Sequence, residues 1–223
     1  MSAHIVWDWN GTLLHDVEAV LDATNASFAE VGMAPITMER YRELYCVPVP
    51  HFYRRLIGRM PTQREWEVLD AAFHRHYWAR VEACDLAEGV TELLTGWSAA
   101  GRTQSILSMS PHAHLVPLVR RYGVESHFVR IQGNPGANGG GKSEHMVRHL
   151  RQLREEDGLA FRPEQVVVIG DASDDARAAL AAGARAVLYT GGSHSRSALE
   201  EVGVPVVDTL AEAVSVALDQ ISS

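Results

Sequence analysis

A continuous apolar run at residues 166–169, followed directly by Gly170 and Asp171, constrains the fold more than any other feature of the chain. A strand that is apolar at every position is buried on both faces, as central strands of parallel sheets are. Short apolar segments alternate with segments of helical periodicity on both sides of this run. The expected strands are residues 4–7, 104–109, 127–131, 166–169, 186–189 and 204–207, and the expected helices of this region are residues 90–99, 112–122, 143–156, 174–182, 195–202 and 209–220. The alternation predicts an α/β fold with a doubly wound, Rossmann-like parallel sheet.

A helical insertion interrupts this alternation after the first strand. Apolar residues recur there at spacings of three and four, and no convincing strand pattern occurs. The expected helices are at about residues 16–31, 38–46, 50–58 and 62–84. Thr37 and Thr62 stand where N-caps are expected. We therefore expect a core formed by residues 1–15 plus 87–223 and an inserted helical domain formed by residues 16–86.

Charge and hydropathy narrow the class of partner. The 223 residues carry a formal net charge of −8, which argues against nucleic acid as the main partner, because phosphate backbones bind clustered lysine and arginine. No apolar run reaches the roughly 18 residues that crossing a bilayer requires. An apolar strand follows the first residues at once, without a signal-peptide pattern. We expect a cytoplasmic protein that does not bind membranes, and the sequence leaves monomer and homodimer open.

Cysteine and histidine spacings do not indicate a metal site. Cys46 and Cys84 are far apart and are expected to be reduced thiols. Two histidine pairs have spacings that occur in metal sites, namely His112 with His114 and His145 with His149. No third ligand is evident for either pair, so we interpret these histidines as solvated or structural.

Polar side chains follow three of the expected strands, namely Asp8, Ser108 and Asp171. Ligand sites in open α/β sheets lie at the carboxyl ends of the strands. Lys142, the single lysine beside 19 arginines, follows a glycine-rich loop at the start of an expected helix. Lysine is a compact point charge that arginine does not reproduce. Two carboxylates, a hydroxyl and a lysine suit metal-assisted phosphoryl transfer, in which one carboxylate attacks and the metal offsets its repulsion from the anionic substrate.

These residues lie in four segments that resemble the motifs of the haloacid dehalogenase superfamily of phosphatases. The segment WDWNGTL at residues 7–13 resembles the first motif, DxDGT. The apolar strand that ends in Ser108 resembles the second motif, and Lys142 fits the third. The segment VIGDASDD at residues 168–175 fits the fourth motif, GDxxxD. Order and approximate spacing agree along the whole chain, and the insertion corresponds to the helical cap of the phosphoglycolate-phosphatase-like subgroup.

The resemblance implies a phosphohydrolase that acts on a small phosphorylated metabolite. Asp8 would be the nucleophile and would form an aspartyl-phosphate, while Ser108 and Lys142 would bind the transferring phosphoryl group. Arg54 and Arg55 of the insertion either form a solvated face or contact an anionic substrate. Substrate contacts are expected from Gly11, Thr12, Met109, Arg54 and Arg55.

The resemblance also implies Mg²⁺ as the cofactor. Asp8, Asp171 and the backbone carbonyl of Asn10 would ligate this ion, a hard cation that prefers oxygen. Asp175 would support the metal or its waters, and Asp174 is the alternative, since the sequence does not show which of the two side chains turns inward.

One departure from the motif concerns Asn10, which stands where the family has its second aspartate. In the phosphatases that aspartate protonates the leaving oxygen and then activates the hydrolytic water. An amide forms hydrogen bonds but cannot deliver a proton, and general acid–base catalysis contributes about 10²–10⁴-fold in rate. We expect slow turnover of alkyl phosphates and a smaller deficit for acyl or aryl phosphates. A non-catalytic or weakly active binding module is the alternative that Asn10 leaves open.

A second alternative is a nucleotide-binding protein. The segment GANGGGKS, from Gly136 to Ser143, matches the P-loop pattern GxxxxGK[ST] and lies between an expected strand and an expected helix. It begins several residues after its strand, and it would leave the motif at residues 8–12 without a role.

Two other chemistries occur within the superfamily. Phosphonate cleavage needs a lysine in the cap, which this cap lacks, and carbon–halogen cleavage needs no metal, whereas Asp171 and Asp175 favour one.

Overall fold

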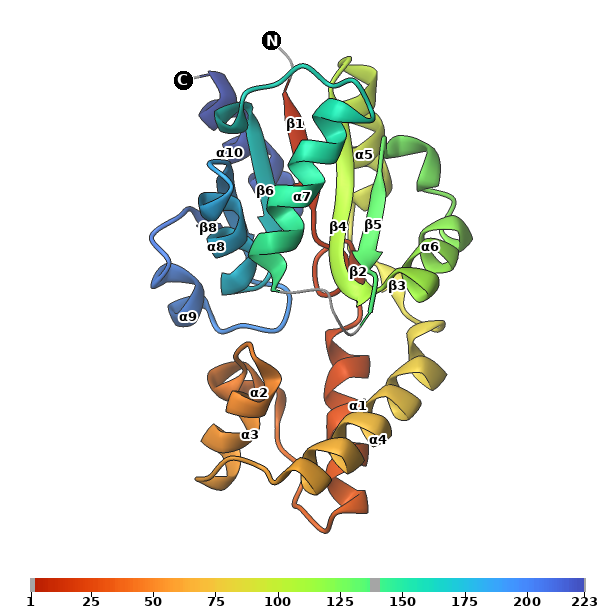
Figure 1. Ribbon diagram of the computed structural model, residues 1–223, viewed down its shortest axis with the longest axis vertical. Helices are drawn as coiled ribbons and strands as arrows, with labels where there is room; N and C mark the ends of the chain where they lie inside the picture. Colours follow the sequence, from red (N-terminus) through yellow and green to blue (C-terminus); the bar gives the residue numbers. More distant parts are fainter. Residues whose placement is uncertain (1–2, 137–140, 223) are drawn as a thin grey trace.

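The computed structural model describes residues 3–136 and 141–222. A six-stranded sheet with the order β5-β4-β1-β6-β7-β8 forms its centre, and every pairing in this sheet is parallel (Figure 1). The strands are β1 (His4–Trp7), β4 (Thr103–Pro111), β5 (Ile131–Asn134), β6 (Val166–Gly170), β7 (Arg185–Tyr189) and β8 (Val206–Val207). The chain starts at the centre of the sheet and builds outward in both directions, so the predicted doubly wound α/β fold is confirmed.

Helices cover both faces of this sheet, and the central strands are buried between them. One face carries α5 (Val90–Ala99), α6 (His112–Arg121) and α10 (Leu210–Ser222), and the other carries α7 (Lys142–Glu155), α8 (Ser173–Ala181) and the short α9 (Arg196–Glu200). In β6, Val167 and Ile169 point into the first apolar cluster, while Val166 and Val168 point into the second. Both faces of β6 are therefore apolar, which explains why its sequence is a continuous run.

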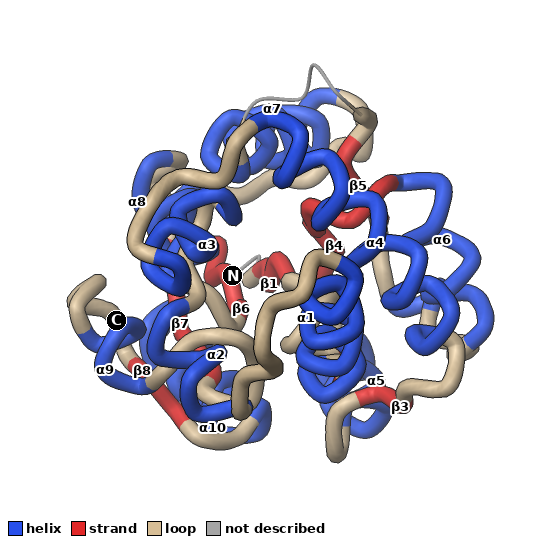
Figure 2. Tube along the Cα trace, turned by 90° about the horizontal axis from the view of Figure 1, so that it is seen from below, coloured by secondary structure: helices blue, strands red, loops and turns tan. Residues whose placement is uncertain are grey.

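The helical insertion lies beyond the carboxyl edge of the sheet (Figure 1). It contains α1 (Val17–Glu30), α2 (Met38–Leu44), α3 (Val49–Ile57) and α4 (Gln63–Val81). Figures 1 and 2 both show α1 packed against α4. Thr37 and Thr62 are N-caps as predicted, and Thr62 forms a capping box with Glu65. The helices share a separate apolar cluster that includes Phe28, Tyr41, Phe52, Tyr53 and Leu69.

A two-stranded antiparallel ribbon joins the insertion to the core. It pairs β2 (Leu14–His15) with β3 (Asp85–Leu86). Each strand is only two residues long, which is too short for a period-two pattern to indicate it. The entry and exit of the insertion are thus held side by side at one place.

Two of the predicted strands have different bounds in the structure. The strand expected at residues 127–131 is a 3₁₀ turn at Glu125–His127 followed by β5, which begins at Ile131. Val129 N already donates to Gln104 O at 3.0 Å, so extended backbone precedes the strand proper. The strand expected at 204–207 is shortened to Val206–Val207, because Pro205 offers no backbone N–H to a sheet. A second 3₁₀ turn spans Pro163–Gln165.

A buried chain of polar side chains crosses one face of the sheet. His4 Nε2 lies 2.8 Å from Ser105 Oγ, which lies 2.8 Å from His149 Nε2. His149 Nδ1 lies 2.7 Å from Gln132 Oε1. Burial lowers the pKa of His4 and of His149 to about 3. His149 therefore has a structural role in this chain of hydrogen bonds.

We expect His4 and His149 to lower the free energy of unfolding once the pH falls below about 6.5, the ordinary histidine pKa, while the raised pKa values of Asp8, Asp16 and Asp171 act in the opposite direction. Between about pH 6.5 and 3 the unfolded chain binds protons at His4 and His149 that the folded chain does not, so the contribution of these two histidines to stability rises with pH in this window. Each histidine contributes up to about 1.4 kcal/mol per pH unit. Urea unfolding followed by circular dichroism at several pH values measures this slope. The variant His149→Gln keeps a hydrogen-bonding side chain and should lose about half of this histidine contribution to the slope; an unchanged slope would contradict the assignment.

Candidate active site

The side chains predicted to carry the chemistry lie at the carboxyl edge of the three central strands. Asp8 directly follows β1, which lies between β4 and β6. Trp7 is level with Ile106 of β4 and with Ile169 of β6. Ser108 and Asp171 therefore stand just beyond the level of Asp8 on the two neighbouring strands. This arrangement follows from parallel pairing, which brings the carboxyl ends of distant sequence segments together.

Lys142, the first residue of α7, points into this cluster. Its Nζ donates to Asp8 Oδ1 at 2.5 Å and also forms an ion pair with Asp175. Burial opposes the charge of Lys142, but the carboxylates of Asp175 and Asp8 outweigh it and hold the pKa of the lysine well above its usual range. Burial raises the pKa of Asp8 well above the ordinary value, although the positive charge of Lys142 acts in the opposite direction. The site thus holds more carboxylate than its lysine can neutralise.

Three carboxylates converge in this site. Asp8, Asp171 and Asp175 each offer one oxygen, and these oxygens lie within 4.8 Å of one another. Burial, with Asp175 as a neighbouring like charge, raises the pKa of Asp171 to about 7. Thr12 Oγ1 donates to Asp171 Oδ1 at 3.2 Å and Ser193 N donates to Asp171 Oδ2 at 2.7 Å, so this carboxylate is held in one orientation. A set of buried carboxylate oxygens with surplus negative charge fits a hard divalent cation such as Mg²⁺.

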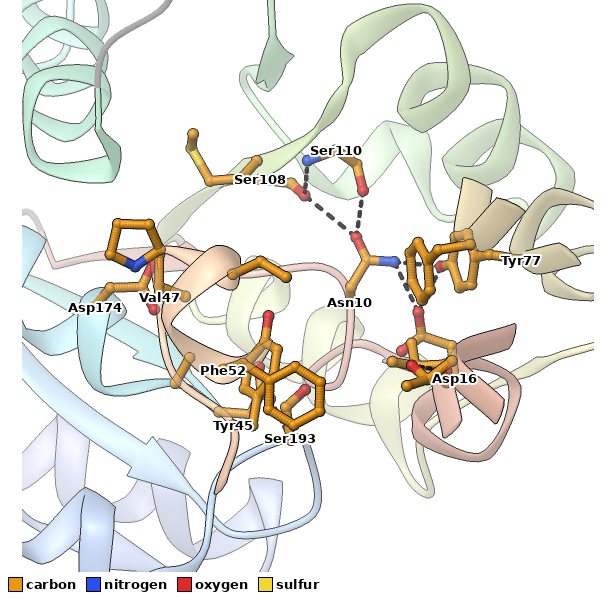
Figure 3. Close-up of a pocket in the computed structure, with 18 of the residues that line it drawn as sticks. Asn10, Asp16, Tyr45, Val47, Phe52, Tyr77, Ser108, Ser110, Asp174 and Ser193 are labelled. Atoms are coloured by element: carbon orange, nitrogen blue, oxygen red, sulfur yellow. Dashed lines mark hydrogen bonds between the residues drawn. The ribbon is translucent and has the colours of Figure 1, made fainter. Parts of the chain in front are cut away.

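The structure distinguishes between the two adjacent aspartates at the start of α8. Asp175 is buried, belongs to the carboxylate cluster, and also accepts a hydrogen bond from Ala172 N at 2.9 Å. Asp174 lines the pocket outside that cluster (Figure 3). Asp175 therefore combines an N-terminal helix contact with a place among the metal-ligand candidates, and Asp174 lines the pocket outside that group.

Gly11 and Thr12 lie behind Asp171. Gly11 has a φ of +72°, and a Cβ built on it would lie 2.6 Å from Asp171 Oδ2. Thr12 is fully buried and donates to the same carboxylate. Neither residue is among those that line the pocket within the described part of the chain. These two residues of the first motif support the acidic cluster from outside the pocket surface.

The side chain of Asn10 is held at both ends by a hydrogen-bond network (Figure 3). Its Nδ2 donates to Asp16 Oδ2 at 2.8 Å and to the hydroxyl of Tyr77 at 2.7 Å. Its Oδ1 accepts from Ser110 Oγ at 2.5 Å and, more weakly, from Ser108 Oγ at 3.4 Å. The amide is therefore fixed in orientation by the core and by α4 of the insertion.

Asp16 and Tyr77 are site residues that the sequence did not indicate. Asp16 precedes α1, yet its side chain caps no helix; it accepts from Gly11 N at 2.7 Å and from the Tyr77 hydroxyl at 2.5 Å. Burial raises the pKa of Asp16, and the hydrogen bond from Tyr77 is the largest opposing influence. At the start of an expected helix, Asp16 has the appearance of an ordinary N-cap, and Tyr77 that of a core aromatic. The one signal in the sequence was a carboxylate, that of Asp16, only a few residues after the first motif.

A pocket of about 540 Å³ opens from this cluster toward the insertion. Its floor is formed by residues of the core, namely Asp8, Asn10, Ser108, Met109, Lys142 and Asp171. Its walls are largely aromatic and apolar side chains of the insertion, including Tyr45, Val47, Phe52, Trp66, Phe73 and Trp78. Met109 is thus on the pocket surface, as expected of a substrate-contacting residue.

The two arginines considered for substrate binding lie elsewhere. Arg54 and Arg55 are exposed on α3, and Arg55 donates from Nη1 to Leu44 O at 3.3 Å. Neither is among the described residues that line the pocket. The apolar face of α3 turns Phe52 and Tyr53 inward, which leaves the adjacent arginines on the solvent side. Of the two readings of these arginines, the solvated face agrees with the structure.

The P-loop alternative depends on residues 136–143, of which residues 137–140 lie outside the described residues. In the part that is described, the ammonium group of Lys142 lies between two carboxylates. A P-loop lysine contacts nucleotide phosphates, whereas this one is directed into an acidic cluster. Among the described residues, no helix combines the length and apolar character that crossing a membrane requires.

Comparison with known proteins identifies the family of the chain. The protein is a hydrolase: a family model for haloacid dehalogenase-like hydrolases matches residues 3–183. The chain belongs to that family. A phosphoglycolate phosphatase of Rhodobacter capsulatus is 24% identical over 195 residues, 86% of either chain. The tyrosine-protein kinase PtkA of Mycobacterium tuberculosis is 26% identical over 95% of this chain and 72% of its own.

Solved structures show the same fold. A haloacid dehalogenase-like protein of Agrobacterium tumefaciens superposes over 100% of both chains with a TM-score of 0.79 at 20% identity. A likeness at this identity concerns the fold. The family match confirms the expected haloacid dehalogenase-like hydrolase, and two relatives named phosphoglycolate phosphatase are consistent with the expected subgroup.

Proposed function

We propose that this enzyme is a Mg²⁺-dependent phosphohydrolase that passes the phosphoryl group of a small phosphorylated metabolite through Asp8. The convergence of Asp8, Asp171 and Asp175 within 4.8 Å, with Lys142 on Asp8, carries the proposal. When bound, Mg²⁺ would supply charge that offsets the repulsion between these carboxylates and the phosphoryl oxygens. Asp171, Asp175, Asp8 and the Asn10 carbonyl would hold the ion.

The chain's own residues then account for two steps. A carboxylate oxygen of Asp8 attacks phosphorus, the ester P–O bond breaks, and an aspartyl-phosphate forms. Lys142 and Ser108 hold the phosphoryl oxygens during this transfer. Since Asn10 carries no acidic proton, the leaving oxygen departs as an anion that takes its proton from water. Water then attacks the same phosphorus, which releases inorganic phosphate and regenerates Asp8.

We further propose that residues 16–86 act as a cap domain over a core of residues 1–15 plus 87–223. The β2–β3 ribbon joins the two parts at one place, and the pocket lies between the core cluster and the aromatic side chains of the insertion. A cap in this position would exclude water from the phosphoryl group during transfer.

The names of the relatives leave the substrate of this chain undecided. One is named a phosphatase of phosphoglycolate, a carboxylate-bearing alkyl phosphate, and another is named a kinase of protein tyrosine, an aromatic hydroxyl that accepts the phosphoryl group. Both activities pass a phosphoryl group, which agrees with the proposed role of Asp8. The side chains around the pocket are therefore the better guide to the substrate.

Removal of the metal tests the proposal. Phosphate release from a panel of small phosphate esters should fall by about 10²-fold or more with EDTA and recover when Mg²⁺ is added in excess, because the metal supplies several kcal/mol of charge stabilisation. Colorimetric determination of inorganic phosphate measures this. Phosphate release that is indifferent to EDTA would overturn the proposed metal requirement, and metal binding without turnover of any ester would favour the binding module.

A further inference from the structure

We propose that the leaving group of the substrate is an uncharged aromatic ring, so that the enzyme prefers aryl phosphates to phosphates that carry a carboxylate. This inference rests on the proposed phosphohydrolase function and specifies the substrate class of the same site. Three observations support it: the charge of the pocket, the chemistry of its walls, and the hydrogen bonds of Asn10.

The charge of the pocket disfavours an anionic leaving group. Six carboxylates lie on its surface: Asp8, Asp171 and Asp175 are the proposed metal ligands, and Asp16, Asp70 and Asp174 lie outside that set. Among the described residues that line it, the basic side chains are Lys142, which is paired with Asp8 and Asp175, and His74, whose Nδ1 lies 2.9 Å from Asp70 O. A carboxylate on the leaving group would enter a negatively charged space without a partner, which is an unfavourable burial of charge.

The walls of the pocket suit a flat apolar group. Tyr45 and Phe52 lie beside each other on the insertion side, with ring centroids 5.8 Å apart (Figure 3), and Val47 lines the same pocket. Trp66 and Phe73 extend the aromatic surface along α4. Aromatic rings pack favourably against such surfaces in offset or edge-on geometry. A phenyl-sized group attached to a phosphate on Lys142 would be directed toward this wall.

The hydrogen bonds of Asn10 select the same leaving group on independent grounds. Both ends of the amide are occupied by protein partners, and neither the amide nor the Tyr77 hydroxyl, which donates to Asp16, is placed to deliver a proton. An alkoxide leaves poorly without protonation, whereas a phenoxide carries its charge on the ring and needs less help. Site chemistry and pocket chemistry therefore point to one class of ester.

A matched pair of esters tests the inference. We would compare 4-methylphenyl phosphate with 4-carboxyphenyl phosphate, which are similar in size but differ in charge. The carboxyl compound has the more acidic phenol, so intrinsic reactivity favours it and pocket recognition opposes it. We expect kcat/KM with Mg²⁺ to be at least tenfold higher for the methyl compound. We expect calorimetric titration of the Asp8→Asn variant, which does not turn the esters over, to give an at least tenfold lower Kd for the same compound.

A pair of variants at Val47 tests whether pocket charge is the cause. Val47 lines the pocket and is 47% exposed, so a longer side chain can be accommodated there. Val47→Arg should reduce the ratio of kcat/KM for the methyl compound to kcat/KM for the carboxyl compound at least tenfold, because the guanidinium group can pair with the carboxylate of the substrate. Val47→Met adds length without charge and should keep the preference. An equal change in both variants would overturn the electrostatic explanation.

The outcomes separate this inference from the proposed function. Turnover of 4-carboxyphenyl phosphate or of 2-phosphoglycolate that equals or exceeds that of 4-methylphenyl phosphate would overturn the inference and leave the phosphohydrolase proposal standing. Tighter binding of the methyl compound without turnover of any ester would support the inference and overturn the proposed function. Preference for phosphocholine over 4-methylphenyl phosphate would overturn the choice of an uncharged ring, since the walls would then be selecting a cation.

Discussion

Replacement of Asp8 with asparagine is expected to lower kcat for phosphate release by about 10⁴-fold or more, as loss of a nucleophile does in enzymes with covalent intermediates. The variant keeps the size of the side chain and removes the charge that attacks phosphorus. Asp8 is buried and bonded to Lys142, so asparagine occupies the same space. Steady-state phosphate release measures the loss, and mass spectrometry after an acid quench should find the phosphoryl adduct in the wild-type protein alone.

A surface carboxylate offers the matched control for this experiment. Asp22 is exposed on α1, and the variant Asp22→Asn makes the same chemical change away from the pocket. It should retain wild-type turnover. Residual activity of Asp8→Asn within tenfold of the wild type, with an unchanged thermal midpoint, would exclude Asp8 as the nucleophile.

Asn10→Asp is expected to raise the rate for alkyl phosphates by about 10²–10⁴-fold, with a smaller gain for aryl phosphates. The substitution supplies the proton that an alkoxide leaving group needs. The new carboxyl would stand where Asn10 Nδ2 now donates to Asp16 Oδ2 at 2.8 Å, so two carboxyl groups would share that contact. Like charges at such a distance favour retention of one proton, which keeps an acid available near the leaving oxygen.

Rates of Asn10→Asp and of the wild type on phenyl phosphate and on glycerol phosphate give the gain for an aryl phosphate and the gain for an alkyl phosphate separately. The double variant Asn10→Asp/Asp16→Asn provides the comparison in which the neighbouring carboxylate is absent. Equal gains on both esters, or no gain on either, would contradict the role assigned to position 10.

The central fold could be predicted because its causes are local and repeated. The apolar run of β6 needs only neighbours on both faces, and alternation of strands and helices leaves few topologies open. The cluster of Asp8, Asp171 and Lys142 was predictable for a related reason: parallel strands end at one edge, so residues after the strands meet there. The start of β5 was not predictable, since extended backbone beside a strand and paired strand have the same apolar pattern, whereas Pro205 was a signal in the sequence for the shortened β8.

The pocket was less predictable because it depends on how helices rotate. Arg54 and Arg55 are adjacent to Phe52 and Tyr53 in the sequence, and only the packing of α3 decides which pair faces inward. Tyr77 reaches Asn10 across 67 positions of chain, a contact that no local pattern encodes. Substrate selection resides mainly in such long-range contacts, which is why the motifs indicated the reaction class but not the leaving group.

The scarcity of lysine has a practical consequence. Lys142 is the sole lysine of the chain and is 8% exposed, with its ammonium group enclosed by two carboxylates. Acylating reagents for amines therefore have one side-chain target in the entire protein, and it is shielded while the site is intact. The rate at which this side chain is acylated, followed by mass spectrometry, therefore reports how often the catalytic centre opens to solvent.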